Sequence, residues 1–225
     1  MKLWIYGDSF AMDHQDDSQW HHRLQSHYEC DLSITAYSGY PNEKIISSMA
    51  HDLSNIAAND WIIIITTDEM RRWFFPDYPE YSNYYNLKKE QLDLVHKDAD
   101  KALELYSRVL LNPESDKFNF VCQTYYLNQI TAGRNVIHIN AFKNSAQATQ
   151  VGSTRVHGTL TESLSLPEFL NDTQRKYMYM SGDTRFNHIS HNNHIHFANK
   201  LRSIIDQETN ELDLTKGFEL KFLSI

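Results

Sequence analysis

Ser9 is the residue in this sequence that is best positioned for nucleophilic chemistry. It follows the apolar run that begins at Lys2, and Gly7 and Asp8 stand directly before it. This pattern predicts a buried strand that delivers the serine onto a turn at its carboxyl end, where open α/β sheets keep their active sites. Backbone N–H groups at such a turn bind a developing oxyanion. The alternative is an ordinary turn that leads into a helix.

A second loop of similar design follows the next predicted strand. That strand covers Asp31 to Ala36, and the loop Tyr37 to Asn42 separates it from a predicted helix over 43–56. Taken alone, Gly39 permits the turn and Asn42 caps the helix. Because Gly39 and Asn42 follow the next predicted strand after the one that leads to Ser9, they gain weight as parts of the same site.

These loops, together with residues 181–201, resemble the motif blocks of the SGNH (GDSL-like) hydrolases. The Gly-Asp-Ser tripeptide ending at Ser9 matches the first block, and Gly39, with Asn42 close behind it, stands at the glycine of the second. His188, followed by Ala198 about ten residues later, matches the histidine that precedes the family's last helix. The resemblance implies that Ser9 is the nucleophile, that His188 is its base, and that the N–H groups of Ser9 and Gly39 hold the oxyanion.

The sequence departs from the family at the third block, where a Gly-x-Asn-Asp pattern supplies an asparagine donor to the oxyanion hole. Here the predicted strand over 60–66 runs into Thr67, Asp68 and Glu69. The asparagine position falls near Glu69, and an ionised carboxylate only accepts hydrogen bonds. Thr67 or a more remote side chain is then the third donor, or the hole has two donors.

The acid that orients His188 also departs from the pattern. Arg185 occupies the position three residues before the histidine, and Asp183 stands two residues further back. Two arrangements remain open: Asp183 reaches the imidazole, or a backbone carbonyl holds the ring in a Ser-His dyad.

Aromatic residues are dense between Arg71 and Asn86. Pro76 and Pro79 prevent one regular helix or strand throughout this range. Because the segment follows the central strand, we predict a cap over the Ser9 face, with Trp73 and Tyr78 as a binding platform for a sugar chain. The alternative is that these rings pack into the core or a subunit interface.

Four histidines near the end of the chain offer a rival metal site: His188, His191, His194 and His196. Histidines three residues apart share a helix face and can approach one ion. The spacing matches no HExxH pattern, and closely spaced histidines on a terminal helix are typically solvated.

The remaining periodicity predicts the elements that position these residues. An amphipathic helix over 16–28 carries its histidines on the solvent face, and another helix covers 118–133. The strand over 135–140 buries His138 as a hydrogen-bonded core residue. The resemblance implies an α/β, flavodoxin-like three-layer sandwich with a parallel sheet of about five strands, in a single domain over 1–225 with the aromatic segment as an insertion.

Composition excludes some partners. The formal net charge is −8, from 21 basic and 29 acidic residues, and no basic run appears, so nucleic acid is not an expected partner. Cys30 and Cys122 lie far apart and are predicted to be buried free thiols. No signal peptide or membrane span is present, so we expect a soluble, cytoplasmic protein with no membrane partner. The oligomeric state is not readable.

The predicted function is that of a serine esterase, which hydrolyses an acyl ester through an acyl-serine intermediate and needs no cofactor or metal. The aromatic segment makes an acetylated carbohydrate a reasonable substrate. Two alternatives stay open: an inactive domain of the same fold that binds a glycan or a protein, and a metal-dependent hydrolase that uses the histidine cluster.

Overall fold

A parallel sheet forms the centre of the molecule. The structure is a computed structural model that describes residues 1–13, 17–69, 71, 112–144, 149–160, 189 and 191–218. Four strands lie in the order β2-β1-β3-β4, and all pairs are parallel. The strands are β1 (Lys2–Gly7), β2 (Asp31–Ala36), β3 (Trp61–Thr66) and β4 (Asn135–Asn140).

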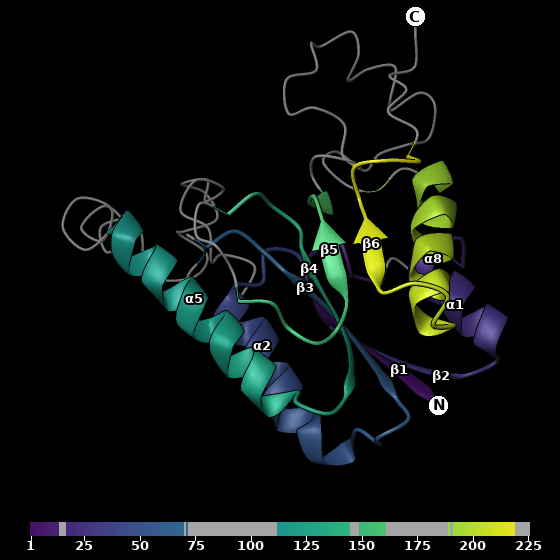
Figure 1. Ribbon diagram of the computed structural model, residues 1–225, viewed down its shortest axis with the longest axis horizontal. Helices are drawn as coiled ribbons and strands as arrows, with labels where there is room; N and C mark the ends of the chain where they lie inside the picture. The colour runs from purple at the N-terminus through teal and green to yellow at the C-terminus, as the bar shows by residue number, and fades with distance from the viewer. Residues whose placement is uncertain are drawn as a thin grey trace, which may run out of the picture.

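Helices cover both faces of this sheet (Figure 1). On one face lie α1 (Trp20–Tyr28) and α8 (His191–Ile205), and on the other lie α2 (Asn42–Asp52) and α5 (Pro113–Ile130). A short 3-10 helix, η1 (Leu53–Asn55), continues α2. This is a flavodoxin-like, three-layer α/β sandwich, which confirms the predicted fold class. The prediction was a parallel sheet of about five strands, and the described residues form four of them.

A smaller sheet lies apart from the central one. It consists of β5 (Arg155–His157) and β6 (Glu211–Asp213), which pair in parallel. Leu212 of β6 is buried in the same core cluster as Leu201 of α8. The small sheet therefore packs against the α8 side of the sandwich.

The isoleucine run of β3 explains the central position of that strand. Ile63 and Ile65 pack toward α1 and α8, whereas Ile62 and Ile64 pack toward α2 and α5, and all four side chains are fully buried. A strand that is apolar on both faces can lie only inside a sheet covered on both sides. The sequence prediction of a central strand here is confirmed.

Two helices begin at different residues from those predicted. α5 begins at Pro113, earlier than expected, because the Asn112 side chain accepts hydrogen bonds from the Glu114 and Ser115 N–H groups and proline suits the first helical position. α1 begins at Trp20, whose N–H donates to His194 Nδ1 of α8 at 3.3 Å.

The predicted solvent exposure of the α1 histidines is wrong for one of them. His21 is fully buried, His22 is half-buried and His27 is exposed. His21 is buried because it lies in the first turn of α1, beside the buried Trp20 ring at 5.2 Å between centroids. The amphipathic pattern does not show this local packing.

Both cysteines are free thiols, but neither is buried as predicted. Cys30 is half-buried beyond the end of α1, and Cys122 is exposed on α5. Within the described part of the chain, no helix combines the length and apolar character needed to cross a membrane.

Candidate active site

The carboxyl ends of three adjacent strands bring the first predicted site residues to one edge of the sheet. Gly7 of β1 pairs with Ala36 of β2, so the two strands end level with each other. On the other side, Tyr6 pairs with Ile64 of β3, one residue before the β1 strand ends. The loops that carry Ser9, Gly39 and Thr67 therefore leave the sheet at the same edge, around the central strand β1.

Ser9 lies in a tight turn that Asp8 braces. The Phe10 N–H donates to Asp8 Oδ1 at 3.1 Å, and the Ala11 N–H donates to the Asp8 carbonyl at 3.0 Å. Asp8 is fully buried, whereas Ser9 is half-buried. The turn thus buries the acid and leaves the serine accessible to solvent.

Gly7 is needed for this turn because the backbone passes very close to its neighbours. A Cβ atom at position 7 would lie 2.9 Å from the Ala11 Cβ and 3.1 Å from the Ile65 Cβ. Real Cβ atoms essentially never show a distance as short as the first, so a side chain at this position would force its neighbours to move. The absence of a side chain lets the turn after β1 fold back against β3.

Gly39 is required by the conformation of the second loop. The Tyr40 N–H donates to the Tyr37 carbonyl at 3.2 Å, which closes a β-turn, and Gly39 has a φ of 76° as the third residue of that turn. Positive φ at this position favours glycine. Tyr37 is 55% exposed at the rim, and its ring lies 4.8 Å from the Tyr40 ring.

Asn42 joins the second loop to the end of β3. Its Oδ1 accepts from the Thr67 N–H at 2.8 Å, and its Nδ2 donates to the Thr67 carbonyl at 3.2 Å. Asn42 is only 2% exposed. Both polar atoms of this side chain therefore hold the backbone at Thr67.

A second asparagine holds the same loop from the opposite side. Asn144, beyond β4, accepts from the Glu69 N–H at 3.0 Å and donates to the Thr67 carbonyl at 3.4 Å. The Thr67 backbone is thus fixed by two amides. Its Oγ1 is buried and has no hydrogen-bond partner among the described residues. A buried hydroxyl without a partner lowers the stability of the folded protein. The Thr67 hydroxyl is therefore a candidate for a functional role.

A buried ion pair connects the Ser9 turn to the loop after β3. Arg71 Nη1 lies 3.1 Å from Asp8 Oδ2, and the two side chains are 9% and 0% exposed. The guanidinium also lies over the Phe142 ring, with 5.0 Å between Cζ and the ring centroid. Arg71 Nε has no hydrogen-bond partner among the described residues. A positive charge is therefore held at the same edge as Ser9.

A buried polar cluster lies beneath this edge, between β3 and β4. Thr66 Oγ1 donates to Asn140 Oδ1 at 2.8 Å and lies 3.0 Å from His138 Nε2. Because the hydroxyl proton points to Asn140, the neutral His138 ring donates its Nε2–H to the threonine oxygen. Burial lowers the pKa of His138 from 6.5 to about 4. The prediction that His138 is a hydrogen-bonded core residue is confirmed.

The predicted site residues fall into two groups. Ser9, Gly39, Thr67 and Asn42 are gathered at the carboxyl edge of the sheet, as described above. The other four predicted site residues lie outside the described residues: His188, Asp183, Trp73 and Tyr78.

Sequence analysis missed two residues that shape this edge, Arg71 and Asn144. Arg71 was noted only as the start of an aromatic segment, and its partner Asp8 lies 63 residues away in the chain. Asn144 follows the His138 strand, and its contact with Glu69 spans 75 residues. The available signal was their position just beyond strands β3 and β4, where polar side chains reach the same edge.

No protein-family model matches the chain, and no curated protein matches it. Among solved structures, the chain is similar to a carbohydrate esterase whose active site is described as having divergent catalytic and non-catalytic binding functions. The TM-score is 0.41 and the identity 11%, over 92% of this chain and 68% of that chain. A likeness of this degree carries no argument about activity.

Proposed function

We propose that this protein is a serine ester hydrolase of the SGNH type that acts through an acyl-serine intermediate. The observation that carries the proposal is the meeting of the Ser9, Gly39 and Thr67 loops at the carboxyl edge of adjacent parallel strands, where the chain order reverses around β1. In this proposal, residues 1–225 form one domain, and the aromatic segment 71–86 is an insertion.

The proposed reaction begins with proton transfer from the Ser9 hydroxyl to His188, as Oγ attacks the ester carbonyl. The N–H groups at Ser9 and Gly39 stabilise the oxyanion, and the Thr67 hydroxyl is the third donor. His188 then protonates the leaving alcohol, and water, activated by the same histidine, releases the acid from Ser9. Asp183 orients the imidazole.

Thr67 is our candidate for the third donor, beside two asparagines whose amides hold its backbone. Asn42 and Asn144 each donate one amide proton to the Thr67 carbonyl, and Asn42 also donates to the Asp68 carbonyl at 3.5 Å. The Thr67 hydroxyl, by contrast, is buried and has no partner among the described residues. This supports Thr67 as the third oxyanion donor, a role that an asparagine has in the family.

An acetylated carbohydrate is the proposed substrate. The exposed Tyr37 ring supports this choice, since it stands in the same turn as Gly39 and offers an apolar face at the rim of the site. Trp73 and Tyr78 are proposed to extend this aromatic surface.

The test is labelling of the purified protein with a fluorophosphonate serine probe, together with hydrolysis of p-nitrophenyl acetate and an acetylated oligosaccharide. We expect labelling and turnover in the wild type and their loss in Ser9→Ala and His188→Ala. Ser47→Ala, which alters an exposed serine on α2, is the matched control and keeps both. Wild-type protein that is neither labelled nor active would overturn the proposal. Retained binding of the oligosaccharide in that case would favour a glycan-binding domain of the same fold.

A further inference from the structure

Three potential metal ligands meet beside the first turn of α1. They are Asp13, His21 and His22, and one ligand atom of each lies within 4.8 Å of the others. His22 Nε2 lies 3.1 Å from Asp13 Oδ1. His21 is fully buried, His22 is half-buried and Asp13 is exposed, so the cluster runs from the core to the surface.

The two histidine rings converge although they are consecutive in sequence. Neighbouring side chains on an α-helix diverge by about 100° around the axis. Here the ring centroids of His21 and His22 are 4.5 Å apart, with an angle of 59° between the planes. The Trp20 ring, which meets His21 edge to face, holds the buried imidazole on this side. Ligand atoms of both rings therefore lie close to each other and to Asp13.

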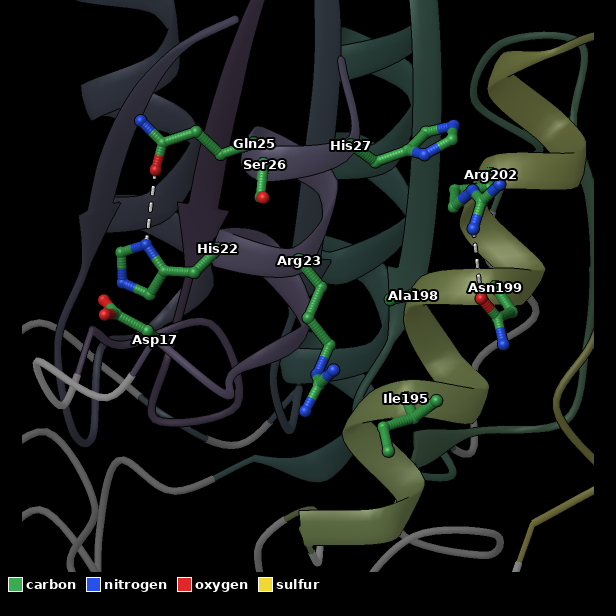
Figure 2. Close-up of a pocket in the computed structure, with 10 residues that line it drawn as sticks. All are labelled: Asp17, His22, Arg23, Gln25, Ser26, His27, Ile195, Ala198, Asn199 and Arg202. Carbon is green, nitrogen blue, oxygen red and sulfur yellow. Dashed lines mark hydrogen bonds between the residues drawn. The ribbon is translucent and has the colours of Figure 1, made fainter. Parts of the chain in front are cut away.

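A hydrogen bond on the far side of His22 supports Nε2 as the nitrogen that binds a cation. His22 Nδ1 lies 3.4 Å from Gln25 Oε1, an oxygen that only accepts (Figure 2). In the tautomer whose Nδ1–H donates to Gln25, Nε2 carries the lone pair and faces Asp13 Oδ1 at 3.1 Å, so that one cation can bind both atoms. An outer hydrogen bond that fixes the tautomer is also the usual support of a metal-binding histidine.

We propose that Asp13, His21 and His22 bind one divalent transition-metal ion, with Zn²⁺ as the best match. Two imidazole nitrogens and one carboxylate oxygen are ordinary zinc ligands, and water completes the tetrahedron. Bonds of about 2.0–2.2 Å in a tetrahedron place neighbouring ligand atoms about 3.3–3.6 Å apart, a little more than the His22–Asp13 separation. Small rotations of the exposed Asp13 and half-buried His22 side chains bring the set together around His21.

The site opens onto a cavity at the surface. His22 lines a cavity of about 620 Å³ between α1 and α8, and Asp17 lies beside its ring (Figure 2). The Asp17 carboxylate adds a second negative charge near the proposed ion. A hydrated cation can therefore approach the cluster from solvent.

A bound ion would fasten the loop after Ser9 to α1, because Asp13 belongs to that loop and both histidines belong to the helix. This role is structural and does not depend on the proposed ester hydrolysis. The metal-site proposal is tested by metal binding, and the hydrolase proposal is tested by acylation of Ser9. The failure of either can therefore be observed separately.

The test is titration of the metal-stripped full-length chain with Zn²⁺ by calorimetry, with thermal unfolding measured in parallel. We expect one ion per chain and a higher melting temperature in its presence. His22→Gln and Asp13→Asn should each weaken binding by at least about tenfold. His27→Gln on the same helix and His196→Gln on α8 are matched controls and should bind as the wild type does.

Cobalt(II) gives a second readout that does not depend on stability. The wild type should show the visible absorption of a tetrahedral nitrogen–oxygen site, and Asp13→Asn, which alters only an exposed side chain, should lose it. Wild-type protein that binds no zinc would overturn the proposal and leave an ordinary His22–Asp13 ion pair. Loss of binding in His196→Gln but not in His22→Gln would also overturn it, by assigning the ion to the histidines near the end of the chain.

Discussion

Arg71 Nη1 lies 3.1 Å from Asp8 Oδ2, and this buried contact joins the turn that carries Ser9 to the loop after β3. Asp8 Oδ1 accepts at the same time from the Phe10 N–H. The carboxylate therefore holds both the turn itself and the neighbouring loop. The positive charge compensates the buried acid at the edge where the candidate nucleophile stands.

The Asp8–Arg71 pair should make a large, coupled contribution to stability. Arg71→Met leaves a buried carboxylate without this cation, so we expect the free energy of unfolding to fall by about 3 kcal/mol or more. The double variant Asp8→Asn/Arg71→Met should lose clearly less than the sum of the two single variants. Urea denaturation of the four proteins measures this coupling.

An exposed ion pair provides the control for that cycle. Lys117 and Glu114 of α5 lie 2.7 Å apart at the surface. Lys117→Met should leave the unfolding midpoint unchanged, because solvent screens such pairs. Strictly additive effects of the Asp8 and Arg71 substitutions would show that the buried contact does not join the two loops.

Thr66 ends β3 and Thr67 follows it, and substitutions at these two positions should have different effects. We expect one to lower kcat and the other to lower the free energy of unfolding. Thr67→Val removes a buried hydroxyl that has no partner among the described residues, so stability should be unchanged or slightly higher. If that hydroxyl stabilises the oxyanion, kcat should fall by roughly 10². Thr66→Val instead removes the contacts with His138 and Asn140 and should cost about 1–2 kcal/mol of unfolding free energy.

The measurements are steady-state kinetics on p-nitrophenyl acetate and urea unfolding for both threonine variants. An unchanged kcat in Thr67→Val, in a preparation where Ser9→Ala is inactive, would remove Thr67 from the oxyanion hole. The third donor would then be a more remote side chain, or the hole would have two donors, which are the other arrangements that the sequence leaves open.

The sequence predicted those features that local patterns determine. The apolar run of β3 identified a central strand, and the residues before Gly7 identified a strand that ends at Ser9, because burial on both faces leaves a continuous apolar signature. Each of these patterns spans only a few residues. The parallel, three-layer arrangement of these strands was expected from the family resemblance.

The contacts that build the edge of the site were not predictable in the same way. Asp8 and Arg71 are 63 residues apart, and Asn42 and Thr67 are 25 apart. Such pairs depend on which loops the sheet order brings together, and no spacing rule along the chain encodes them. The burial of His21 was missed for a related reason, since the side chain packs beside Trp20 although its helix is amphipathic.

His138 should make the stability of the protein depend on pH in a defined window. Burial holds the pKa of His138 at about 4 in the folded protein, whereas its ordinary value is 6.5. Between these values the unfolded chain binds a proton that the folded protein does not. The free energy of unfolding therefore falls as the pH drops from about 6.5 to about 4, by about 3 kcal/mol in total from this residue.

Urea unfolding of the wild type and of His138→Gln, repeated at several pH values from 4 to 8, isolates this contribution as the difference between the two proteins. Glutamine retains an amide that can donate to the Thr66 hydroxyl, but it does not titrate. The advantage of the wild type should be largest above about pH 6.5 and should shrink steadily toward pH 4. His51→Gln, at an exposed position on α2, should follow the wild type. A difference between wild type and His138→Gln that does not change with pH would mean that this imidazole is not held neutral by burial.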